Sequence, residues 1–311
     1  MDPTVIPSEH FDEFEEGIPM ANVLITGASS GIGLATALEL GRAGHTVFAT
    51  MRNPSRAPRL AETAQSEGLP VSIHTLDVDS DESVRRCFAE VGGPLDVLVN
   101  NAGVEAHGSI EELPMEAFIA TMNTNYFGAV RCIKAVLPGM RAAKKGCIIN
   151  ISSVAGRIAS SPLGPYNASK FALEAMSESL AGEVKPHNIR VAIVEPGIQD
   201  TKMAHAIEDP PPSAYPHTRR FAGLFRAALE HHVPPETTAA VVRHIIESGT
   251  WQVRHASGPD AAPFLAWRAS MSDEQWVDWN AQEDEAWYDA VQQTFGLNAR
   301  PQARAGGAGE Y

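Results

Sequence analysis

The feature that most constrains the fold of this chain is a regular alternation between short apolar runs and helix-like stretches. The runs are rich in β-branched residues, and turn residues bound each of them. Continuous apolar runs are typical of strands buried on both faces, and strand–helix alternation predicts parallel pairing. The predicted strands lie at 22–26, 45–50, 71–76, 95–100, 146–152 and 189–195, with one more near 251–256. The sequence therefore predicts an α/β fold: a doubly wound, Rossmann-type parallel sheet with helices on both faces.

The length of 311 residues suits one large α/β domain or two small ones. Residues 1–20 are acidic and contain three prolines, so we interpret them as an extension ahead of a catalytic domain at 21–260. The proline-rich segment 208–216 directly follows the carboxyl end of a predicted strand, where open α/β sheets bind ligands. We therefore interpret residues 198–232 as a lid. The alternative is a plain surface loop.

A third segment, 261–311, is predicted to be a helical extension rich in tryptophan. All five tryptophans of the chain lie at or after residue 251, and Trp276, Trp279 and Trp287 have spacings that fit one helix face. We interpret this stripe as packing against the body of the protein or against a neighbouring subunit. The alternative is a wall of the substrate pocket. The last stretch, 299–311, has a composition typical of disordered ends.

Composition and charge exclude several classes of function. The formal net charge is −14, which argues against nucleic acid because phosphate binding requires a basic face. No apolar run is long enough to span a membrane, and no metal-ligand spacing of His or Cys is present. Cys87, Cys132 and Cys147 are widely spaced, and the amino terminus lacks the pattern of a signal peptide. We therefore expect a cytoplasmic protein with no metal and no membrane span.

Residues 24–40 have the pattern of a strand, a glycine-rich turn and a helix. Glycines allow the backbone to approach a pyrophosphate closely, and the helix that follows directs the positive end of its dipole at the negative charge. The spacing is G-x-x-x-G-x-G, and the flanking strand and helix supply the context that such a motif requires. The turn residues expected to contact a dinucleotide are Gly27, Ser29, Ser30, Gly31, Ile32 and Gly33.

The second and third predicted strands bear on the adenosine end of that dinucleotide. NAD-binding versions of this motif place an acid at the end of the second strand, whereas this chain has Thr50 there and Arg52 two residues later. An arginine without an acid suits a 2′-phosphate, so we expect NADP(H) in preference to NAD(H). The alternative is that Arg52 is merely exposed. Asp77, followed by Val78, either accepts from the adenine amino group or caps the next helix.

Tyr166 and Lys170 are one helical turn apart, so their side chains share a face. Reduction of a carbonyl leaves an alkoxide that must take up a proton, and a tyrosine can supply one. As a base, tyrosine needs help because it titrates near pH 10, and the Lys170 ammonium is expected to lower its pKa. Ser153 is expected to hydrogen-bond the substrate oxygen, with Ser152 as the neighbouring alternative.

With these residues together, the chain resembles the short-chain dehydrogenase/reductase family over about residues 21–260. It looks most like the NADP-preferring branch that includes 17β-hydroxysteroid dehydrogenases and retinol dehydrogenase-like reductases. The matching motifs occur in family order: TGASSGIG (26–33), NNAG (100–103), NYFG with Asn125, ISSVAG with Ser153, Tyr166-Asn-Ala-Ser-Lys170, and EPG (195–197) with Thr201.

The resemblance implies further roles for residues of this chain. Lys170 would hold the nicotinamide ribose, and Asn125 would hold a water that links Lys170 to solvent, unless it is simply a buried amide satisfied by backbone. Residues expected to line the cofactor are Asn101, Ala102, Gly103, Pro196, Gly197, Ile198 and Thr201. The family also pairs the two helices expected near 115–142 and 166–185 across a two-fold axis, so we expect a homodimer or homotetramer.

The leading hypothesis is an NADP(H)-dependent oxidoreductase acting on an apolar secondary alcohol or its ketone, for example a steroid-like, retinoid-like or aryl compound. One alternative is an NADP(H)-binding sensor or scaffold without turnover, and others are an NAD(H)-dependent dehydrogenase of the same fold, or an isomerase or dehalogenase that recycles the hydride. Glu105 and His107 border the expected pocket mouth, where either contacts a polar substrate group or faces solvent.

Overall fold

The computed structural model describes residues 20–207 and 212–301. Its centre is a sheet of seven strands, all paired in parallel, in the order β3-β2-β1-β4-β5-β6-β7. The strands are β1 (Asn22–Thr26), β2 (Thr46–Met51), β3 (Val71–Thr75), β4 (Val97–Asn100), β5 (Gly146–Ile151), β6 (Ile189–Pro196) and β7 (Arg254–Ser257). The predicted α/β fold is confirmed, and each predicted strand overlaps an observed one.

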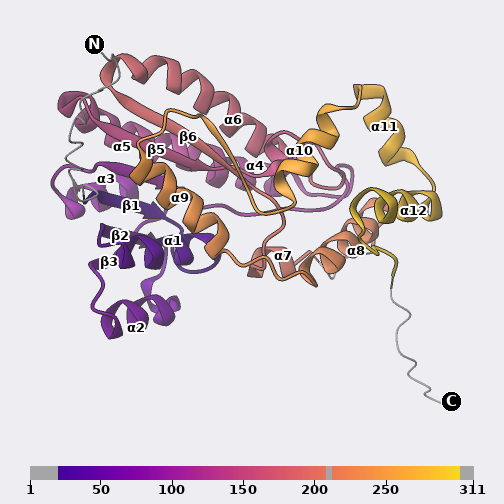
Figure 1. Ribbon diagram of the computed structural model, residues 1–311, viewed down its shortest axis with the longest axis horizontal. Helices are drawn as coiled ribbons and strands as arrows, with labels where there is room; N and C mark the ends of the chain where they lie inside the picture. The colour runs from indigo at the N-terminus through magenta and orange to yellow at the C-terminus, as the bar shows by residue number, and fades with distance from the viewer. Residues whose placement is uncertain (1–19, 208–211, 302–311) are drawn as a thin grey trace, which may run out of the picture.

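Helices cover both faces of the sheet (Figure 1). The α-helices are α1 (Gly31–Arg42), α2 (Pro58–Ser66), α3 (Asp81–Val91), α4 (Met115–Met122), α5 (Gly128–Ala143), α6 (Gly164–Val184), α7 (Lys202–His205), α8 (His217–Leu229), α9 (Glu236–Ser248), α10 (Ala261–Ala269), α11 (Asp273–Ala281) and α12 (Asp284–Phe295). Short 3-10 segments lie at η1 (Pro54–Arg56), η3 (Val154–Gly156) and η4 (Lys185–His187), and η2 (Asn123–Phe127) is a turn of π-helix.

Alternate side chains of the central strands pack into two separate hydrophobic cores, one on each face of the sheet. Val23 and Ile25 of β1 pack with α1, α2 and α9 on one face. Leu24, between them, packs with α3, α5 and α6 on the other face. This division follows from the two-residue period of a strand, and it explains why the central strands β1, β4, β5 and β6 contain consecutive apolar residues. A rigid sheet covered on both faces leaves its carboxyl edge as the place where loops form a site.

The long helix expected near 115–142 is interrupted. The π-helical turn η2 separates α4 from α5, and it contains Asn125. Such single turns often occur at functional sites because they reorient one side chain within a helix. The second expected helix, near 166–185, is confirmed as α6.

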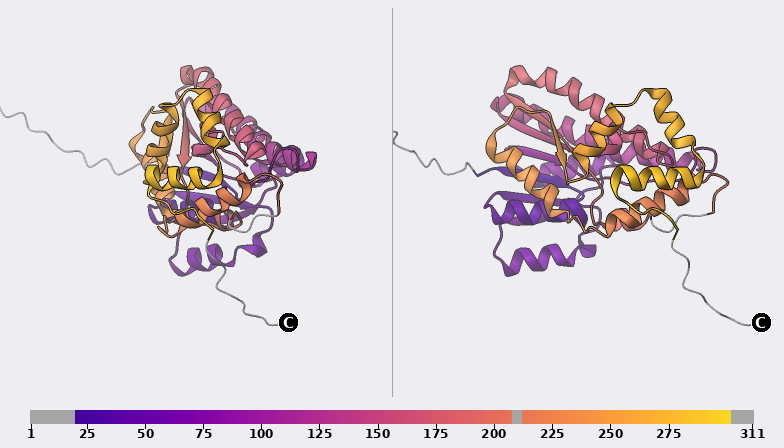
Figure 2. Two further views of the ribbon diagram at one scale, coloured as in Figure 1. Left: turned by 90° about the vertical axis from the view of Figure 1, so that its right-hand side faces the viewer. Right: turned by 45° about the vertical axis from the view of Figure 1, so that its right-hand side comes forward.

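Most of the segments after β6 gather beyond the carboxyl edge of the sheet, whereas α9 packs on a face of the sheet. Helices α8, α10, α11 and α12 lie together at one end of the molecule, and the turned views show them as a separate layer beside the sheet (Figures 1 and 2). Trp287, Tyr288 and Val291 of α12 pack against Ala227 of α8. The expected lid therefore contributes α7 and α8, but its residues 208–211 lie outside the described part of the chain.

Two expectations concern residues at the chain ends. The acidic extension at 1–20 and the last residues from 302 onward lie outside the described residues, apart from Met20. Ala299, which opens the stretch expected to be disordered, is instead buried against α8, where a β-carbon on Gly223 would meet its carbonyl oxygen.

Within residues 20–207 and 212–301, no helix combines the length and apolarity that crossing a membrane requires.

Candidate active site

A cavity of about 400 Å³ opens at the carboxyl edge of the sheet. The turns that follow β1 to β6 form one side of it, and side chains from α8, α10, α11 and α12 form the other. All of the residues expected to bind cofactor or perform catalysis line this cavity except Gly33 and Asn125. The sequence motifs, which are spread over 175 positions from Gly27 to Thr201, thus converge on one site.

The glycine turn packs tightly against the turn after β4. Gly27 has a φ of +70°, and a β-carbon there would lie 2.7 Å from Cα of Ala102. At Gly33 a β-carbon would lie 2.4 Å from the carbonyl oxygen of Gly27. Asn101 holds the two turns together, because its Nδ2 donates to the carbonyl oxygens of Thr26 (2.9 Å) and Gly27 (3.0 Å). Asn101 therefore shapes the glycine turn from behind.

The amino terminus of α1 suits an anionic group. Ser30 is its N-cap residue, but the Ser30 side chain makes no capping hydrogen bond, and the first turn contains no acidic residue. The amide donors of this turn are therefore not covered by a side-chain acceptor of their own helix, and the helix dipole favours negative charge there. Gly31, with a φ of +55°, permits the sharp entry into the helix. These features fit a dinucleotide pyrophosphate.

The end of β2 presents a cation to the same cavity. Arg52 is exposed and lines the cavity, and no hydrogen bond or ion pair joins it to another residue of the described chain. Thr50 is fully buried and donates its hydroxyl proton to the carbonyl oxygen of Ile25 (3.0 Å), so it is part of the sheet. A guanidinium without an ion pair, on a strand that does not end in an acid, fits a phosphate group better than a pair of hydroxyls.

Asp77 and Val78, after β3, also line the cavity. The Asp77 carboxylate accepts from the backbone N–H of Asp79 (3.1 Å). Of the two alternatives considered for Asp77, capping of α3 is not its role, because Ser80 is the N-cap and accepts from the N–H of Ser83 (3.2 Å).

Tyr166 and Lys170 share one face of α6 and meet in the cavity wall. Nζ of Lys170 lies 5.5 Å from the centre of the Tyr166 ring and donates to the carbonyl oxygen of Ile151 (2.9 Å). Lys170 is 5% exposed, and burial lowers its pKa to about 8, although the Glu174 carboxylate opposes this. Ile151 ends β5, so this hydrogen bond fixes α6 to the edge of the sheet.

The expected lowering of the Tyr166 pKa is wrong for this arrangement. Burial raises the pKa of Tyr166 to about 12, and the hydrogen bond from Ser153 lowers it by less. The charge of Glu105 raises it further. The cost of burying a phenolate therefore outweighs the favourable contacts, and Tyr166 holds its proton at neutral pH.

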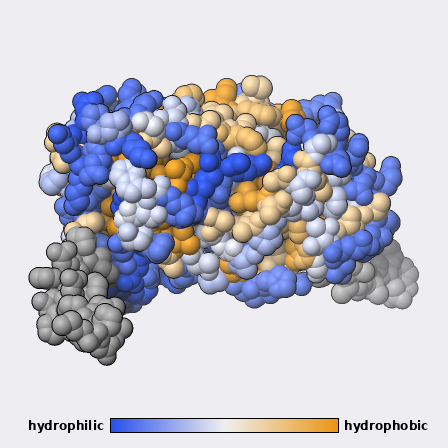
Figure 3. Space-filling view, turned by 45° about the horizontal axis from the view of Figure 1, so that its top comes forward, coloured by the Kyte–Doolittle hydropathy of each residue, from blue (hydrophilic) through white to orange (hydrophobic). Residues whose placement is uncertain are grey.

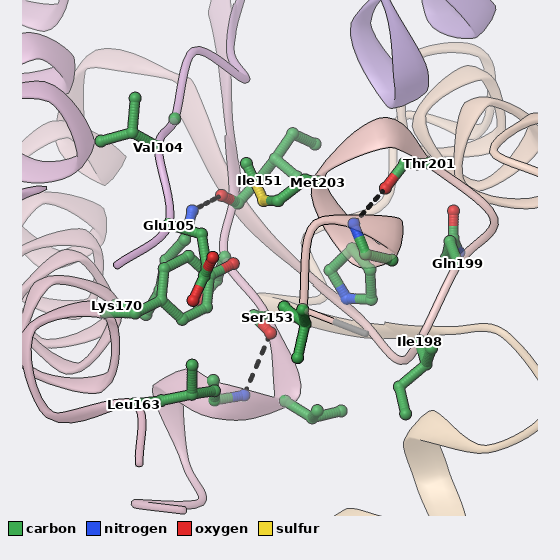
Figure 4. A pocket seen from close by; sticks show the side chains of 18 of the residues that line it. Val104, Glu105, Ile151, Ser153, Leu163, Lys170, Ile198, Gln199, Thr201 and Met203 are labelled. Atoms are coloured by element: carbon green, nitrogen blue, oxygen red, sulfur yellow. Dashed lines mark hydrogen bonds between the residues drawn. The ribbon is translucent and has the colours of Figure 1, made fainter. Parts of the chain in front are cut away.

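Of the two serines considered, Ser153 is the one hydrogen-bonded to Tyr166. Ser153 is the N-cap of η3, and its Oγ accepts from the N–H of Ala155 (3.1 Å) (Figure 4). Ser152 also lines the cavity, but its Oγ is buried without a hydrogen-bond partner among the described residues, next to Gly156 and Glu174. The geometry favours Ser153 for contact with a substrate oxygen.

Asn125 is 2% exposed and does not line the cavity. Its side chain exchanges two hydrogen bonds with the backbone of Val104, at 2.8 and 2.9 Å, and also donates to Oγ of Ser169 (2.9 Å). The side chain therefore positions the turn after β4. This matches the alternative interpretation, in which Asn125 is a buried amide satisfied by backbone groups. A β-carbon on Gly103 would lie 3.4 Å from Asn125 Oδ1 and 3.9 Å from Lys170 Nζ, which places all three together.

The segment after β6 forms the opposite wall. Pro196, Gly197, Ile198 and Thr201 line the cavity as expected. The N–H of Ile198 donates to Asp260 (2.8 Å), and a β-carbon on Gly197 would overlap the same carboxylate. Thr201 is the N-cap of α7 and accepts from the N–H of Ala204 (3.3 Å). Asp260, from outside every motif, therefore fixes this segment.

The tryptophan-rich extension is a wall of the cavity, so the preferred interpretation of simple packing is wrong as a full account. Trp267 lies at its centre, with its ring centre 5.5 Å from that of Trp276 and 4.9 Å from those of Trp279 and Phe295, all edge to face. The prediction that Trp276, Trp279 and Trp287 share one helix face is wrong, because Trp276 and Trp279 belong to α11 whereas Trp287 belongs to α12. Other wall residues that the sequence did not reveal are Met203, Ile207, Phe221, Leu224, Phe225 and Phe264.

Glu105 and His107 form an ion pair at the cavity. Nδ1 of His107 lies 3.0 Å from both carboxylate oxygens of Glu105, and the Glu105 side chain is 8% exposed. This hydrogen bond raises the pKa of His107. His205 and His232 instead pair with Asp200 at the base of the expected lid. No group of three or more His, Cys, Asp or Glu side chains in the described ranges is arranged to hold a metal ion.

Comparisons with known proteins agree with this geometry. The family model for short chain dehydrogenases matches residues 21–211. Retinol dehydrogenase 8 of Bos taurus is 39% identical over 264 residues, covering 79% of this chain and 84% of the bovine protein. Retinol dehydrogenase 8 of Homo sapiens is 45% identical over 179 residues, and the match spans 56% of this chain and 58% of the human protein, less than two thirds of its length.

Solved structures give the same result. A short-chain dehydrogenase from Streptomyces avermitilis has a TM-score of 0.71 and 32% identity, covering 84% of this chain and 96% of the other. A single-substitution variant of actinorhodin polyketide ketoreductase, solved with NADPH, has a TM-score of 0.68 and 31% identity, covering 76% of this chain and 94% of the other.

Proposed function

Because this chain belongs to the short-chain dehydrogenase family, we propose that it transfers a hydride between NADP(H) and a secondary alcohol or its ketone. The observation that carries the proposal is the meeting of Tyr166, Lys170 and Ser153 in a cavity that continues to the glycine turn. When bound, the nicotinamide supplies or accepts the hydride. The residues of the chain bind the cofactor and the substrate, orient them, and transfer the proton.

We assign the proton transfer to Tyr166. In the direction of reduction, the phenol donates its proton to the substrate oxygen as the carbonyl carbon receives the hydride. Its raised pKa keeps that proton in place at neutral pH. Ser153 donates to the same oxygen, and so stabilises the negative charge that develops on it. In the direction of oxidation the same groups act in reverse.

Lys170 and Asn125 support this pair in the proposed reaction. Lys170 contributes a buried positive charge beside Tyr166 and would hold the ribose next to the nicotinamide. Asn125 holds the backbone turn at Val104, close to Lys170, and in this proposal it shapes the cavity wall rather than touching substrate.

We propose NADP(H) as the preferred cofactor. Support comes from the exposed Arg52, the missing acid at Thr50 and the uncovered amino terminus of α1. A 2′-phosphate would meet Arg52, and the pyrophosphate would meet the turn from Gly27 to Gly33. The related ketoreductase that was solved with NADPH supports the same choice.

The proposed substrate is apolar. The wall opposite the cofactor turns consists of tryptophan, phenylalanine, leucine and methionine side chains, which suit a steroid-like, retinoid-like or aryl ketone. We also propose a cytoplasmic location, which is supported by three buried, unpaired cysteines, Cys87, Cys132 and Cys147.

A homodimer or homotetramer is part of the proposal. Met115, Ile119, Phe127 and Phe171 are each at least 42% exposed and belong to α4, η2 and α6. In Figure 3, which brings the top of Figure 1 forward, hydrophobic residues gather in the middle of the face between hydrophilic ends. An exposed apolar surface of this kind suits a second copy of the chain. A monomer in analytical ultracentrifugation would contradict this assignment.

The catalytic proposal is tested with purified protein, NADPH or NADH, and a panel of apolar ketones, followed by the loss of the reduced nicotinamide absorbance. We expect turnover with NADPH and weaker turnover with NADH. Binding of either nicotinamide without turnover of any ketone would favour a sensor or scaffold instead. Substrate conversion without net consumption of cofactor would indicate an isomerase or dehalogenase.

A further inference from the structure

The cavity contains one carboxylate beside its reacting centre. Within the described part of the chain, three carboxylates line the cavity: Asp77, Asp79 and Glu105. Asp77 and Asp79 follow β3, at the adenosine end near Arg52. Glu105 alone among them is close enough to Tyr166 for its charge to raise the tyrosine pKa. Glu105 and Tyr166 therefore line the same part of the cavity, within electrostatic range of each other.

The ion pair with His107 leaves this carboxylate with unused acceptor capacity. Both Glu105 oxygens contact the same nitrogen, Nδ1 of His107, and His107 does not itself line the cavity. A carboxylate has about four lone-pair directions, so one N–H leaves acceptor positions that face the cavity. Figure 4 shows the Glu105 side chain pointing into the cavity, on the side where Lys170 and Ser153 lie.

The apolar surroundings of Glu105 make its free acceptor positions selective for ligands that carry a hydrogen-bond donor. Much of the remaining cavity wall is apolar or aromatic, and the Glu105 side chain is 8% exposed. A wholly apolar ligand would exclude water from the carboxylate without replacing its hydrogen bonds, which is unfavourable. A ligand with a hydrogen-bond donor at that point would restore them. Sites built in this way discriminate strongly against analogues that lack the donor.

We propose that Glu105 binds a hydrogen-bond donor, a hydroxyl or a protonated amine, that the substrate bears next to its reacting carbon. This inference rests on the proposed hydride transfer and narrows its substrate class. The substrate is then an amphipathic hydroxy- or amino-ketone, or the matching alcohol. Its apolar body lies against the tryptophan wall, and its donor meets Glu105 while the reacting oxygen meets Tyr166 and Ser153. Glu105 determines specificity, and His107 holds it in place.

The test compares three ketones that share one aryl-alkyl body. One is unsubstituted next to the carbonyl, one bears a hydroxyl there, and one bears a primary amine. We expect kcat/KM of the wild-type enzyme to be about tenfold or more higher for one or both substituted ketones. A larger gain for the amine identifies a cationic donor, and a larger gain for the hydroxyl identifies a neutral one. Equal or better turnover of the unsubstituted ketone overturns the inference.

Two variants sharpen the test. In Glu105→Gln, the preference for the amine is expected to collapse, because the amide lacks the negative charge, while the preference for the hydroxyl falls less. In the matched control Glu116→Gln, which alters an exposed glutamate of the neighbouring α4, both ratios should stay at their wild-type values. Unchanged ratios in a folded Glu105→Gln overturn the inference, and if that variant does not fold, the wild-type ratios decide.

Direct binding separates this inference from the proposed function. The same three ketones are titrated into the protein with NADP⁺ present, following quenching of the tryptophan fluorescence. If no ketone is turned over with either nicotinamide, the proposed function fails, but a tighter Kd for the substituted ketones would still support Glu105 as a donor-binding residue. Equal Kd values for all three would overturn it.

Discussion

At the scale of single residues, the site depends on two opposed pKa shifts on one face of α6. Burial raises the pKa of Tyr166 to about 12 and lowers that of Lys170 to about 8. Each shift disfavours the charged form, as desolvation requires. The phenol thus keeps its proton over the physiological range, whereas the lysine is near the limit of its charged range.

This difference predicts a pH limb in the direction of reduction. The charge of Lys170 is present below its pKa and is lost as the pH rises through about 8. Because that charge stabilises the site as Tyr166 gives up its proton, kcat/KM for ketone reduction should fall above about pH 8. A pH–rate profile of the wild-type enzyme measures it. A profile without a limb near that pH would show that Lys170 keeps its charge in the working enzyme.

A second prediction at this scale concerns Arg52. The substitution Arg52→Asp replaces the free guanidinium with an acid of the kind that binds ribose hydroxyls. We expect the ratio of the Kd values for NADH and NADPH to fall by about tenfold or more, since a charge-assisted phosphate contact is lost. Fluorescence energy transfer from tryptophan to the reduced nicotinamide reports both constants. Arg59→Asp, at an exposed position in α2, is the matched control, and an equal shift there would refute the role of Arg52.

At the scale of elements, the positions of the strands could be predicted from the sequence. The surfaces that the tryptophan-rich extension contacts could not. The strand at 22–26 was predicted with its observed bounds, because burial on both faces favours the continuous apolar run at its centre, residues 23–25. The π-helical turn at Asn125 has no sequence signature in its neighbours. The spacing of Trp276, Trp279 and Trp287 suggested one apolar helix face, but the helix breaks between α11 and α12, and the three side chains instead meet at the cavity wall.

The same limit applies within the candidate site. Ser153 and Tyr166 could be placed at the site from the sequence because the order and spacing of their motifs resemble those of the short-chain dehydrogenase family. Asp260, which fixes the segment at Ile198, belongs to no motif, because it acts by contact across 62 positions of sequence. The raised pKa of Tyr166 also escaped prediction, since burial is a property of the packed structure and not of the helical spacing to Lys170.

The aromatic wall gives a prediction at the element scale. Trp267 is the residue that links Trp276, Trp279 and Phe295 by edge-to-face contacts. Trp267→Ala should raise KM for an apolar ketone by roughly tenfold or more, because both its own area and the placement of its neighbours are lost. Steady-state kinetics on one ketone measures the change. Trp251→Ala removes an exposed tryptophan outside the cavity, and a comparable rise in KM there would contradict the assignment.

At the scale of the whole molecule, a charge network connects the sheet to the helix that bears Tyr166 and Lys170. Arg254 of β7 contacts Glu174 of α6 (3.0 Å) and Glu195 of β6 (3.6 Å). Glu195 is 3% exposed, and burial together with the charge of Glu174 raises its pKa to about 7 in spite of Arg254. Stability is therefore linked to pH through this network.

The sign of that linkage follows from the two pKa values of Glu195. The unfolded chain releases this proton near pH 4.5, but the native protein holds it until about pH 7. The native state binds more protons between these values, so the free energy of unfolding falls as the pH rises, by roughly 3 kcal/mol in total. In the Glu195→Gln variant, this fall in the free energy of unfolding should be absent. Urea unfolding of both proteins on either side of the window measures it, and parallel pH dependences would contradict the assignment.

The central claim is that Tyr166 transfers the proton, and that the cofactor binds without help from the Tyr166 hydroxyl. The most direct measurement compares wild type with Tyr166→Phe for ketone turnover and for NADPH binding. Loss of one proton donor should reduce turnover by about 10² to 10⁴-fold, while the Kd for NADPH stays within about twofold, since the pyrophosphate and Arg52 contacts are untouched. Turnover that survives the substitution would contradict the account, because another group would then have to supply the proton.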